Sequence, residues 1–383
     1  MRRSTVSKLS RMMLGCLTTL TLAGTASAKP HMADAARKAL LSGDRVEAQR
    51  VLEGAWLEIQ SEPETLKLLG DLRFHHGETA QAVNAWAQAL ELEPHSFVYA
   101  ERVMKGAGHL GDYARASKAA GTLVRLAKAH WAESIELAPG KAQLARERWL
   151  NALLTHAELA CLAGDYTTAE ASARAHIEAA PGALEGMLSL AYVHLSGDEF
   201  DEAEALYLQI LERSPKLADV HNNLGMIHYL RGDLESAEAA YARGLEYTTQ
   251  EDGLESLLVS NLGELAMLRG AYVDARRLYE DAIEVAPESP WGYMGLATVF
   301  ELNDEPDAAL DAMIDGWSRD PSRLSRLNTR FQKDEWYWHR DALIAELEGE
   351  TDLAVALWSK IAAGTVEALL EPAKHHLQAL RED

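Results

Sequence analysis

The sequence has 383 residues, of which 25% are charged, and its 59 acidic side chains outnumber 37 basic ones to give a formal net charge of −22 at pH 7. A surface this acidic repels nucleic acid and anionic lipid, so we expect neither as a partner. The two cysteines are Cys16 and Cys161, and Cys16 lies in a segment that we expect to be removed. Stability must therefore come from packing and not from an intramolecular disulfide.

Residues 1–28 have the features of a secretory signal peptide. An apolar stretch at residues 12–23 and the small residues Ala26-Ser27-Ala28 follow a basic leader formed by Arg2, Arg3, Lys8 and Arg11. We therefore predict a periplasmic or secreted protein, cleaved after Ala28, with no membrane span elsewhere. In the alternative, residues 13–16 are a lipobox and Cys16 is lipidated in an outer-membrane lipoprotein, although the apolar stretch before Cys16 would be short.

Residues 70–94 set a pattern that recurs almost to the C-terminus. Small, aromatic and proline residues follow one another at fixed spacing, as Gly70, Gly77, Ala82, Trp86, Ala89 and Pro94. A pair of antiparallel helices needs small residues where the helices cross and a glycine to end the first helix in a left-handed turn. Proline, which has no backbone N–H, closes the second helix. The segment resembles a tetratricopeptide repeat, a helix-turn-helix unit of 34 residues.

The alanine that opens each second helix can be followed along the chain, and five of its eight intervals are 34 residues, the others being 53, 38 and 45. These alanines are Ala48, Ala82, Ala116, Ala169, Ala203, Ala237, Ala275, Ala309 and Ala354. Four residues after each of them we expect an inward-facing side chain: Leu52, Trp86, Ala120, Ala173, Tyr207, Tyr241, Tyr279, Met313 and Trp358. The resemblance implies an all-α fold, a right-handed α-solenoid of about nine repeats with a C-terminal capping helix.

We expect the array to span residues 29–363 and the capping helix residues 366–383. The repeats are placed near residues 29–62, 63–96, 97–149, 150–183, 184–217, 218–255, 256–289, 290–334 and 335–365. The third has extended helices on either side of Ala138-Pro139-Gly140. In the fifth, Gly197 lies one residue early, which predicts a turn one residue longer.

A basic cluster lies in the insertion near residues 322–334. It consists of Arg319, Arg323, Arg326, Arg330 and Lys333. The segment is either a solvated linker or a contact for an acidic partner.

Enzyme signatures are not supported by their context. The sequence G-A-G-H-L-G at residues 106–111 matches a dinucleotide-binding pattern, but that site needs a preceding strand and here a helix is expected. His75 and His109 occupy equivalent places in adjacent repeats, as do His194 and His228, yet a metal site needs more ligands. Cys161 is interpreted as a small buried hydrophobe. We predict no catalytic residue, no cofactor and no metal.

The resemblance implies that the first helix of each pair lines a concave groove. By position in the repeat, Glu64, Lys67, Asp71, Glu101 and Lys105 line its N-terminal part. Further along, the lining residues are Leu188, Tyr192, Asn222, Met226, Tyr229, Ser260, Glu264, Met267, Trp291, Met294 and Thr298. Methionine and aromatic side chains suit adaptable recognition of apolar groups, and Asn222, Asn223 and Asn261 could hydrogen-bond an extended peptide. For Tyr229 and Met267, filling gaps between helices is an equal alternative.

Some members of this family hold a peptide carboxylate with lysine, arginine and asparagine side chains. Asn223 and Asn261 fall where an asparagine would, but the basic residues are missing, so carboxylate capture is not predicted. The predicted function is an exported scaffold that binds a protein or peptide in the bacterial cell envelope. The alternatives are a lipid-anchored pilus or secretion accessory protein and a hydrolase built within the array. The predicted binding residues are Tyr192, Asn222, Asn223, Met226, Tyr229, Ser260, Asn261, Trp291 and Met294.

Overall fold

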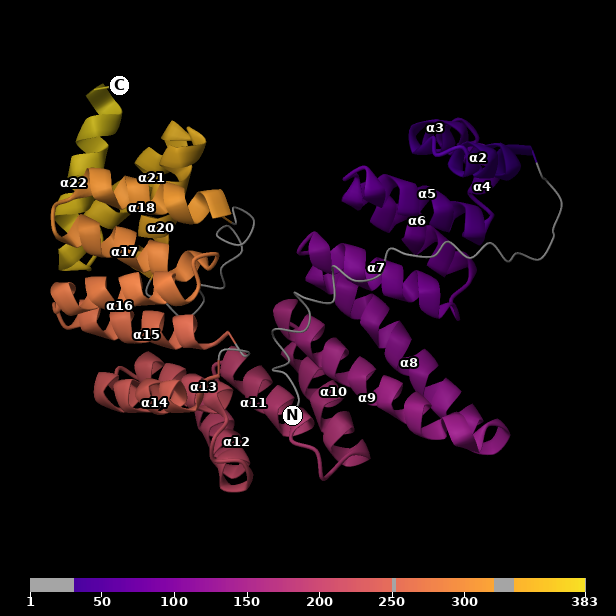
Figure 1. Ribbon diagram of the computed structural model, residues 1–383, viewed down its shortest axis with the longest axis horizontal. Coiled ribbons are helices and arrows are strands. Elements are labelled where there is room, and N and C mark those ends of the chain that lie inside the picture. The colour runs from indigo at the N-terminus through magenta and orange to yellow at the C-terminus, as the bar shows by residue number, and fades with distance from the viewer. Residues whose placement is uncertain (1–30, 250–252, 320–333, 383) are drawn as a thin grey trace. The chain divides into compact units, whose positions relative to one another are not determined.

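The computed structural model describes residues 31–249, 253–319 and 334–382, and within these ranges every regular element is a helix (Figure 1). The predicted signal peptide, Cys16, and the basic residues Arg323, Arg326, Arg330 and Lys333 lie outside them. The described chain forms two compact units, residues 31–210 and 211–382. Each unit is an α-solenoid of stacked helix pairs, as the sequence predicts.

The N-terminal unit is built from ten complete helices and most of an eleventh. Their bounds are α2 (His31–Leu41), α3 (Arg45–Gly54), α4 (Trp56–Ile59), α5 (Pro63–His75), α6 (Thr79–Leu92), α7 (Phe97–His109), α8 (Tyr113–Leu137), α9 (Pro139–Leu162), α10 (Tyr166–Ala179), α11 (Glu185–Ser196) and α12 (Phe200–Arg213).

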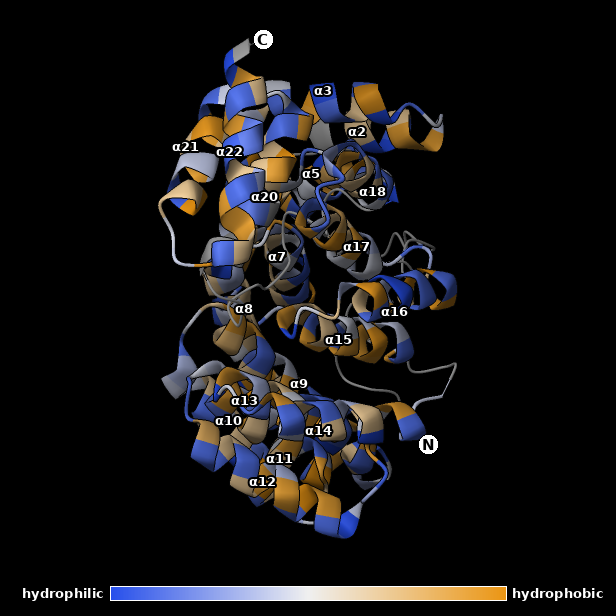
Figure 2. Ribbon diagram, turned by 90° about the vertical axis from the view of Figure 1, so that its left-hand side faces the viewer, coloured by the Kyte–Doolittle hydropathy of each residue, from blue (hydrophilic) through white to orange (hydrophobic). Residues whose placement is uncertain are grey.

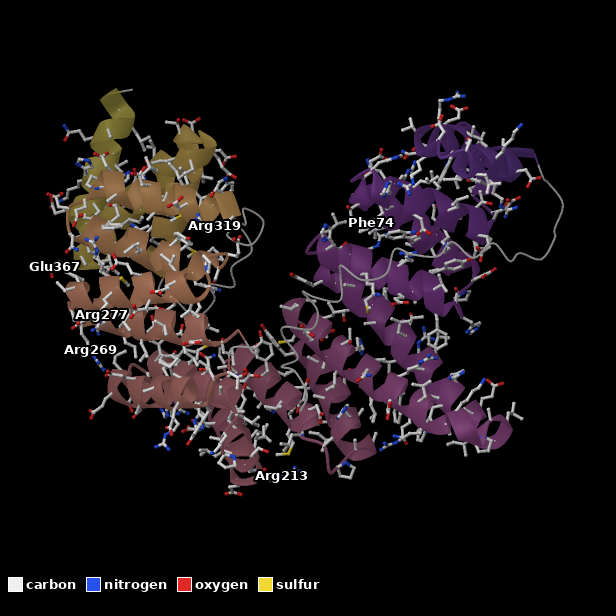
Figure 3. All side chains as sticks on the ribbon, viewed as in Figure 1. Phe74, Arg213, Arg269, Arg277, Arg319 and Glu367 are labelled. Carbon is white, nitrogen blue, oxygen red and sulfur yellow. The ribbon has the colours of Figure 1, made fainter. Side chains whose placement is uncertain are left out.

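The C-terminal unit, which begins in the last turn of α12, continues with helices that again follow one another in pairs. They are α13 (Ala218–Leu230), α14 (Leu234–Tyr247), α15 (Glu255–Leu268), α16 (Tyr272–Val285), α17 (Pro290–Leu302), α18 (Pro306–Arg319), α20 (Asp334–Glu348), α21 (Thr351–Ala362) and α22 (Glu367–Glu382). Arg269, whose side chain is labelled in Figure 3, follows the last residue of α15. It pairs with Glu238 on α14 and donates to the Leu234 carbonyl at 3.0 Å.

The predicted repeat spacing is confirmed by burial. Each of the nine alanines is the fourth residue of a second helix, and each has 0% of its surface exposed. A methyl group lets two helices cross closely, and close packing leaves no room for a larger side chain. All nine residues that stand four positions further along, from Leu52 to Trp358, are also buried.

Glycines on first helices make room for the aromatic side chains of second helices. A Cβ on Gly70 would lie 2.4 Å from Trp86 Nε1, and one on Gly225 would lie 2.5 Å from the Tyr241 ring. Such contacts are too short for a real methyl group, so these aromatic rings pack directly on the backbone of the first helix. The predicted close approach at Gly70 is confirmed.

The turns within the pairs have a common chemistry. In most pairs a glycine with positive φ follows the first helix, whereas Asp198 and Asp304 take this conformation in the α11–α12 and α17–α18 turns. In several turns an aspartate then caps the second helix. After Gly232 (φ 79°), for example, the Asp233 side chain accepts the Ser236 N–H at 3.0 Å. The longer turn predicted at Gly197 is wrong. Asp198 takes the left-handed conformation there (φ 64°), which aspartate tolerates, so the turn keeps its usual length.

The extended helices predicted around residues 138–140 are α8, with 25 residues, and α9, with 24. Pro139 is the first residue of α9, where its missing N–H costs no hydrogen bond. The two helices join through Trp131 and Trp149, which stack with ring centroids 4.9 Å apart. Cys161, on α9, is buried as predicted.

Helix α22 packs against α21 at the end of the C-terminal unit. It carries hydrophobic and hydrophilic residues along its length (Figure 2), which is typical of a helix with one buried face. His376 joins it to α17 through Glu301, with Nε2 and Oε1 3.1 Å apart. None of the described helices is long and apolar enough to cross a membrane. Residues 106–111 form the end of α7 and its turn, as expected for a structural glycine motif.

Candidate functional site

A recess of about 90 Å³ lies in the C-terminal unit among helices α15, α16, α17, α18 and α20. The first helices α15 and α17 supply most of its lining, and the buried residues Tyr279 and Met313 come from second helices. The full lining is Ser260, Asn261, Glu264, Met267, Tyr279, Trp291, Met294, Gly295, Thr298, Met313 and His339. Thioether and aromatic groups thus surround a small number of polar atoms.

Four of the predicted binding residues meet in this recess: Ser260, Asn261, Trp291 and Met294. Backbone geometry explains how Tyr279 also reaches it. A Cβ on Gly295 would lie 2.0 Å from the Tyr279 ring, so the ring occupies space that any other residue would fill. The glycine on α17 therefore helps to position an aromatic side chain of the recess.

Glu264 is the acidic residue of the lining. Its Oε1 accepts the Tyr229 hydroxyl at 2.7 Å. Burial raises the pKa of the Glu264 carboxyl, and the Tyr229 hydrogen bond partly offsets this. Burial beside the same carboxylate also raises the pKa of Tyr229, so this phenol keeps its proton and remains a donor. The predicted residue Tyr229 thus acts on the recess through Glu264.

The three predicted asparagines are not equivalent. Asn222 is 5% exposed, accepts the Asn261 amide at 2.9 Å and donates to Asn223 Oδ1 at 3.3 Å. Its side chain is therefore used within the chain, against the expectation that it hydrogen-bonds a peptide. Asn223 and Asn261 are partly exposed, as is Met226 on α13. The Ser260 hydroxyl also has an internal partner, the Ser256 carbonyl at 2.7 Å.

His339, on α20, is 1% exposed, and its Nε2 has no hydrogen-bond partner among the described residues. Burial lowers the pKa of His339 to about 4, so the imidazole is neutral at physiological pH. Next to it, edge-on at 5.5 Å between ring centroids, lies Trp358, which stacks on His376 at 4.2 Å. His376 is held between Glu301 and Glu346, and these hydrogen bonds raise its pKa to about 9 despite burial.

A model of the tetratricopeptide repeat family matches residues 154–218 and 188–251. The matched part of the chain, residues 154–251, therefore contains tetratricopeptide repeats. No curated protein matches it. The same pairing of helices, with a buried alanine and an inward side chain four residues later, continues on both sides of the matched residues.

Solved structures of similar proteins include a tetratricopeptide repeat protein from Parabacteroides merdae, with 15% identity, coverage of 74% of this chain and 97% of that chain, and a TM-score of 0.43. Yeast Tom70 is 14% identical over 92% of this chain and 95% of its own, with a TM-score of 0.45. Pseudomonas aeruginosa pilF is 17% identical over 62% and 98%, with a TM-score of 0.43. At these values the likenesses carry no argument about function.

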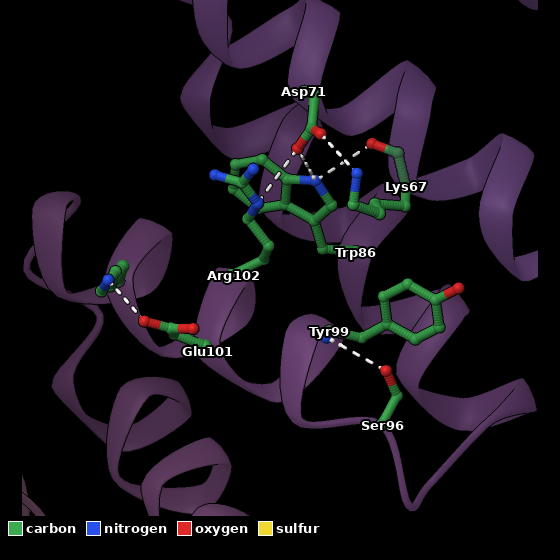
Figure 4. A network of polar contacts seen from close by, with 8 residues as sticks. Lys67, Asp71, Trp86, Ser96, Tyr99, Glu101 and Arg102 are labelled. Atoms are coloured by element: carbon green, nitrogen blue, oxygen red, sulfur yellow. Dashed lines mark hydrogen bonds and ion pairs between the residues drawn. The ribbon is translucent and has the colours of Figure 1, made fainter. Parts of the chain in front are cut away.

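Within the repeats of the N-terminal unit, the polar residues of the predicted groove are paired with one another. Asp71 pairs with Lys67 at 2.9 Å and with Arg102 at 3.2 Å, and it accepts the Trp86 indole N–H at 3.1 Å (Figure 4). Lys105 pairs with Glu101 at 2.6 Å, and Tyr99 donates to Glu64 at 3.0 Å. Tyr192, the predicted residue of this unit, is partly buried against a cluster that includes Ala160 and Val193.

The histidines considered as metal ligands have other contacts. His75 lies against Arg45, and His194 bonds to Glu199 in its own turn. Within the described ranges, no group of three or more His, Cys, Asp or Glu side chains is placed to hold a metal ion.

Four residues of the recess are absent from the predicted groove. Tyr279 and Met313 were placed on second helices as packing residues, and the spacing alone does not tell that they also reach a recess. Gly295 has no side chain to signal a role. His339 follows the insertion after α18, where the repeat spacing is lost, and so its position could not be derived.

Proposed function

We propose that this chain is an exported scaffold of the bacterial cell envelope that binds a protein partner through an extended peptide segment in the C-terminal unit. The recess on α15, α17 and α20 is the observation that carries the proposal. Tetratricopeptide repeats generally mediate protein interactions, and here the first helices present Trp291, Met294 and Asn261 together. The sequence of residues 1–28 supports export.

The lining is suited to holding a side chain of a partner. Binding energy in protein interfaces is concentrated in a few desolvated contacts, with tryptophan prominent among them. Methionines adapt their shape to what they contact. Trp291 is only partly buried, so part of its indole is available to a partner.

The test is a crosslinking pull-down from the periplasmic fraction with a double variant: Trp291→Ala in the recess, and Met226→Ala on α13, in the same predicted groove but outside the recess lining. We expect loss of the partner recovered by the unchanged chain, because truncating an aromatic anchor typically costs about 2 kcal/mol or more of binding energy. The melting temperature should fall only slightly. A matched control is Lys67→Ala with Lys105→Ala, which should retain the partner; the opposite outcome would place the binding site in the N-terminal unit.

Export has a separate test. Mass spectrometry of the mature protein should find Lys29 as the first residue. A diacylglyceryl group on Cys16 would instead establish the lipoprotein alternative, and retention of residues 1–28 would contradict export.

A further inference from the structure

The polar groups that line the recess are mostly hydrogen-bond acceptors. Glu264 supplies a carboxylate, His339 supplies a neutral imidazole, and none of the described lining residues is a lysine or arginine. The hydroxyls of Ser260 and Thr298 donate to carbonyls of their own helices, at 2.7 and 3.0 Å. The recess therefore offers hydrogen-bond acceptors and one carboxyl group inside mostly apolar walls.

Glu264 lacks a counter-ion within the described part of the chain. Among the described residues its carboxylate forms no ion pair, and the hydrogen bond from Tyr229 is neutral. Glu264 is partly buried, and a partly desolvated carboxylate without a cation is costly, since a low dielectric removes hydration that an opposite charge replaces well. A cationic occupant would supply that charge.

His339 gives an independent indication of an occupant. Its Nε2 is buried without a partner, whereas buried polar atoms in proteins are nearly always hydrogen-bonded. Because the imidazole is neutral, one of its two ring nitrogens carries a lone pair that can accept an N–H. His339 lines the recess together with Glu264, so one donor-rich group could satisfy both.

We propose that the recess binds the ammonium or guanidinium group of a lysine or arginine side chain supplied by the partner. This inference rests on the proposed function, since it names the anchor of the peptide segment. The cation donates N–H groups to the Glu264 carboxylate and the His339 imidazole. Its apolar stem lies against Met294 and Met313, and the aromatic side chains of Trp291 and Tyr279 complete the lining around it.

The volume of the recess fits such an anchor. About 90 Å³ accommodates the end of one long side chain but no folded element. The overall charge of the chain, −22, also favours the approach of a basic segment.

The N-terminal unit contains an internal example of the proposed contact. There Arg102 pairs with Asp71 while its guanidinium carbon lies 5.7 Å from the centroid of the Trp86 ring (Figure 4). Carboxylate, aromatic ring and cation all come from the chain itself. In the recess the carboxylate and the aromatic rings are present, and the partner would supply the cation.

The experiment is a titration of the full mature chain with n-butylammonium chloride, a lysine side-chain analogue, followed by NMR of ¹³C-labelled methionine methyl groups. Single Met→Leu variants assign the signals of Met267, Met294 and Met313. We expect saturable shifts of these signals. The neutral analogue n-pentanol should bind at least about tenfold more weakly, because a hydrogen bond to a charged group is worth about 1.5–3 kcal/mol.

Glu264→Gln keeps the shape of the side chain and an oxygen for the Tyr229 hydroxyl, and it should weaken n-butylammonium binding by about tenfold. The matched control Glu238→Gln removes an exposed carboxylate that pairs with Arg269, and it should leave binding unchanged. Equal affinity for n-pentanol, or unchanged affinity in Glu264→Gln, would overturn the inference. If Glu264→Gln does not fold, the comparison of the two analogues on the unchanged chain decides.

The analogue titration does not involve the natural partner. If it fails while the Trp291→Ala and Met226→Ala pair still loses the partner, the proposed function stands and the cationic anchor is wrong. If the analogue binds but the pair retains the partner, the recess is a cation site that does not serve the proposed interaction.

Discussion

Asp71 in the N-terminal unit and Glu264 in the C-terminal unit are both carboxylates on the first helix of a repeat, but their surroundings differ. Asp71 has two cations within 3.2 Å and an indole donor. Glu264 has one phenol donor and, within the described chain, no cation. The N-terminal unit therefore neutralises the charge of Asp71, whereas the C-terminal unit leaves Glu264 without a cation beside a recess, within the described residues.

This difference shows that a repeat has two kinds of position, those that build its fold, called here the frame, and those that form its surface. The frame depends on the buried alanine, the inward side chain four residues later and the glycine turn, and both units share it. The other positions of the first helix are free to vary without changing the fold, which is how one architecture supports different binding chemistry. Function in this chain is thus decided by residues that the repeat pattern does not fix.

The largest effect should come from breaking the shared frame. Ala237 on α14 has 0% exposure, so Ala237→Trp must push α14 away from α13. Overpacking of this kind typically costs about 1–3 kcal/mol, and a fully buried crossing should lie at the upper end. Thermal unfolding followed by circular dichroism measures the change. Ala239→Trp on the exposed side of the same helix is the matched control, and equal midpoints for the two variants would contradict the helix packing described above.

A second prediction concerns the ion pairs between His376 on α22 and the acidic residues of α17 and α20. The groups facing His376 are Glu301 on α17, Glu346 and His339 on α20, and Trp358 on α21. The pKa of His376 is about 9 in the folded chain against 6.5 for a free imidazole. Because the folded pKa is the higher one, its contribution to stability is complete below about pH 6.5 and is lost as pH rises through about 9.

We therefore expect the free energy of unfolding of the C-terminal unit to fall by about 2–3 kcal/mol between pH 6.5 and pH 9.5. His376→Gln should remove most of this dependence, and urea unfolding of both chains at the two pH values checks it. The pKa of His339 is about 4 in the folded chain, below 6.5 for a free imidazole. Its contribution to the free energy of unfolding is therefore present above about pH 6.5 and is lost as the pH falls from 6.5 to about 4. An unchanged pH profile in His376→Gln would show that the pair does not stabilise the unit.

The frame could be predicted from the sequence because it is periodic. Ala237 and Tyr241 were located by counting, and both are buried where the count places them. Counting failed at Gly197, because the sequence pattern assumes that only glycine takes a left-handed turn. Asp198 takes it instead.

The recess could be predicted only in part. Position within the repeat grouped Ser260, Trp291 and Met294, and these three line one recess, since equivalent positions of stacked first helices are neighbours. It could not show that the Asn222 side-chain oxygen accepts a hydrogen bond from Asn261, because hydrogen-bond partners depend on side-chain geometry and not on spacing. His339 was also missed, because it comes from a helix beyond an insertion.

The smallest expected effect is a difference in folding stability between variants of the two carboxylates, Asp71 and Glu264. Asp71→Asn keeps an oxygen for the Trp86 indole but removes the charge that Lys67 and Arg102 share, so we expect a loss of about 1 kcal/mol in the free energy of unfolding. Glu264→Gln should be neutral or slightly stabilising, because burial raises the pKa of this carboxyl and the ionised form therefore opposes folding at neutral pH.

Urea unfolding at pH 7, with and without added sodium chloride, distinguishes the two cases. Salt should diminish the cost of Asp71→Asn, since this cost is an attraction between partly exposed charges. The effect of Glu264→Gln should not depend on salt, because it arises from desolvation and not from a nearby cation. If Glu264→Gln instead destabilises the chain as much as Asp71→Asn does, Glu264 already has a stabilising counter-charge in the folded chain, and the contrast between the two units is wrong.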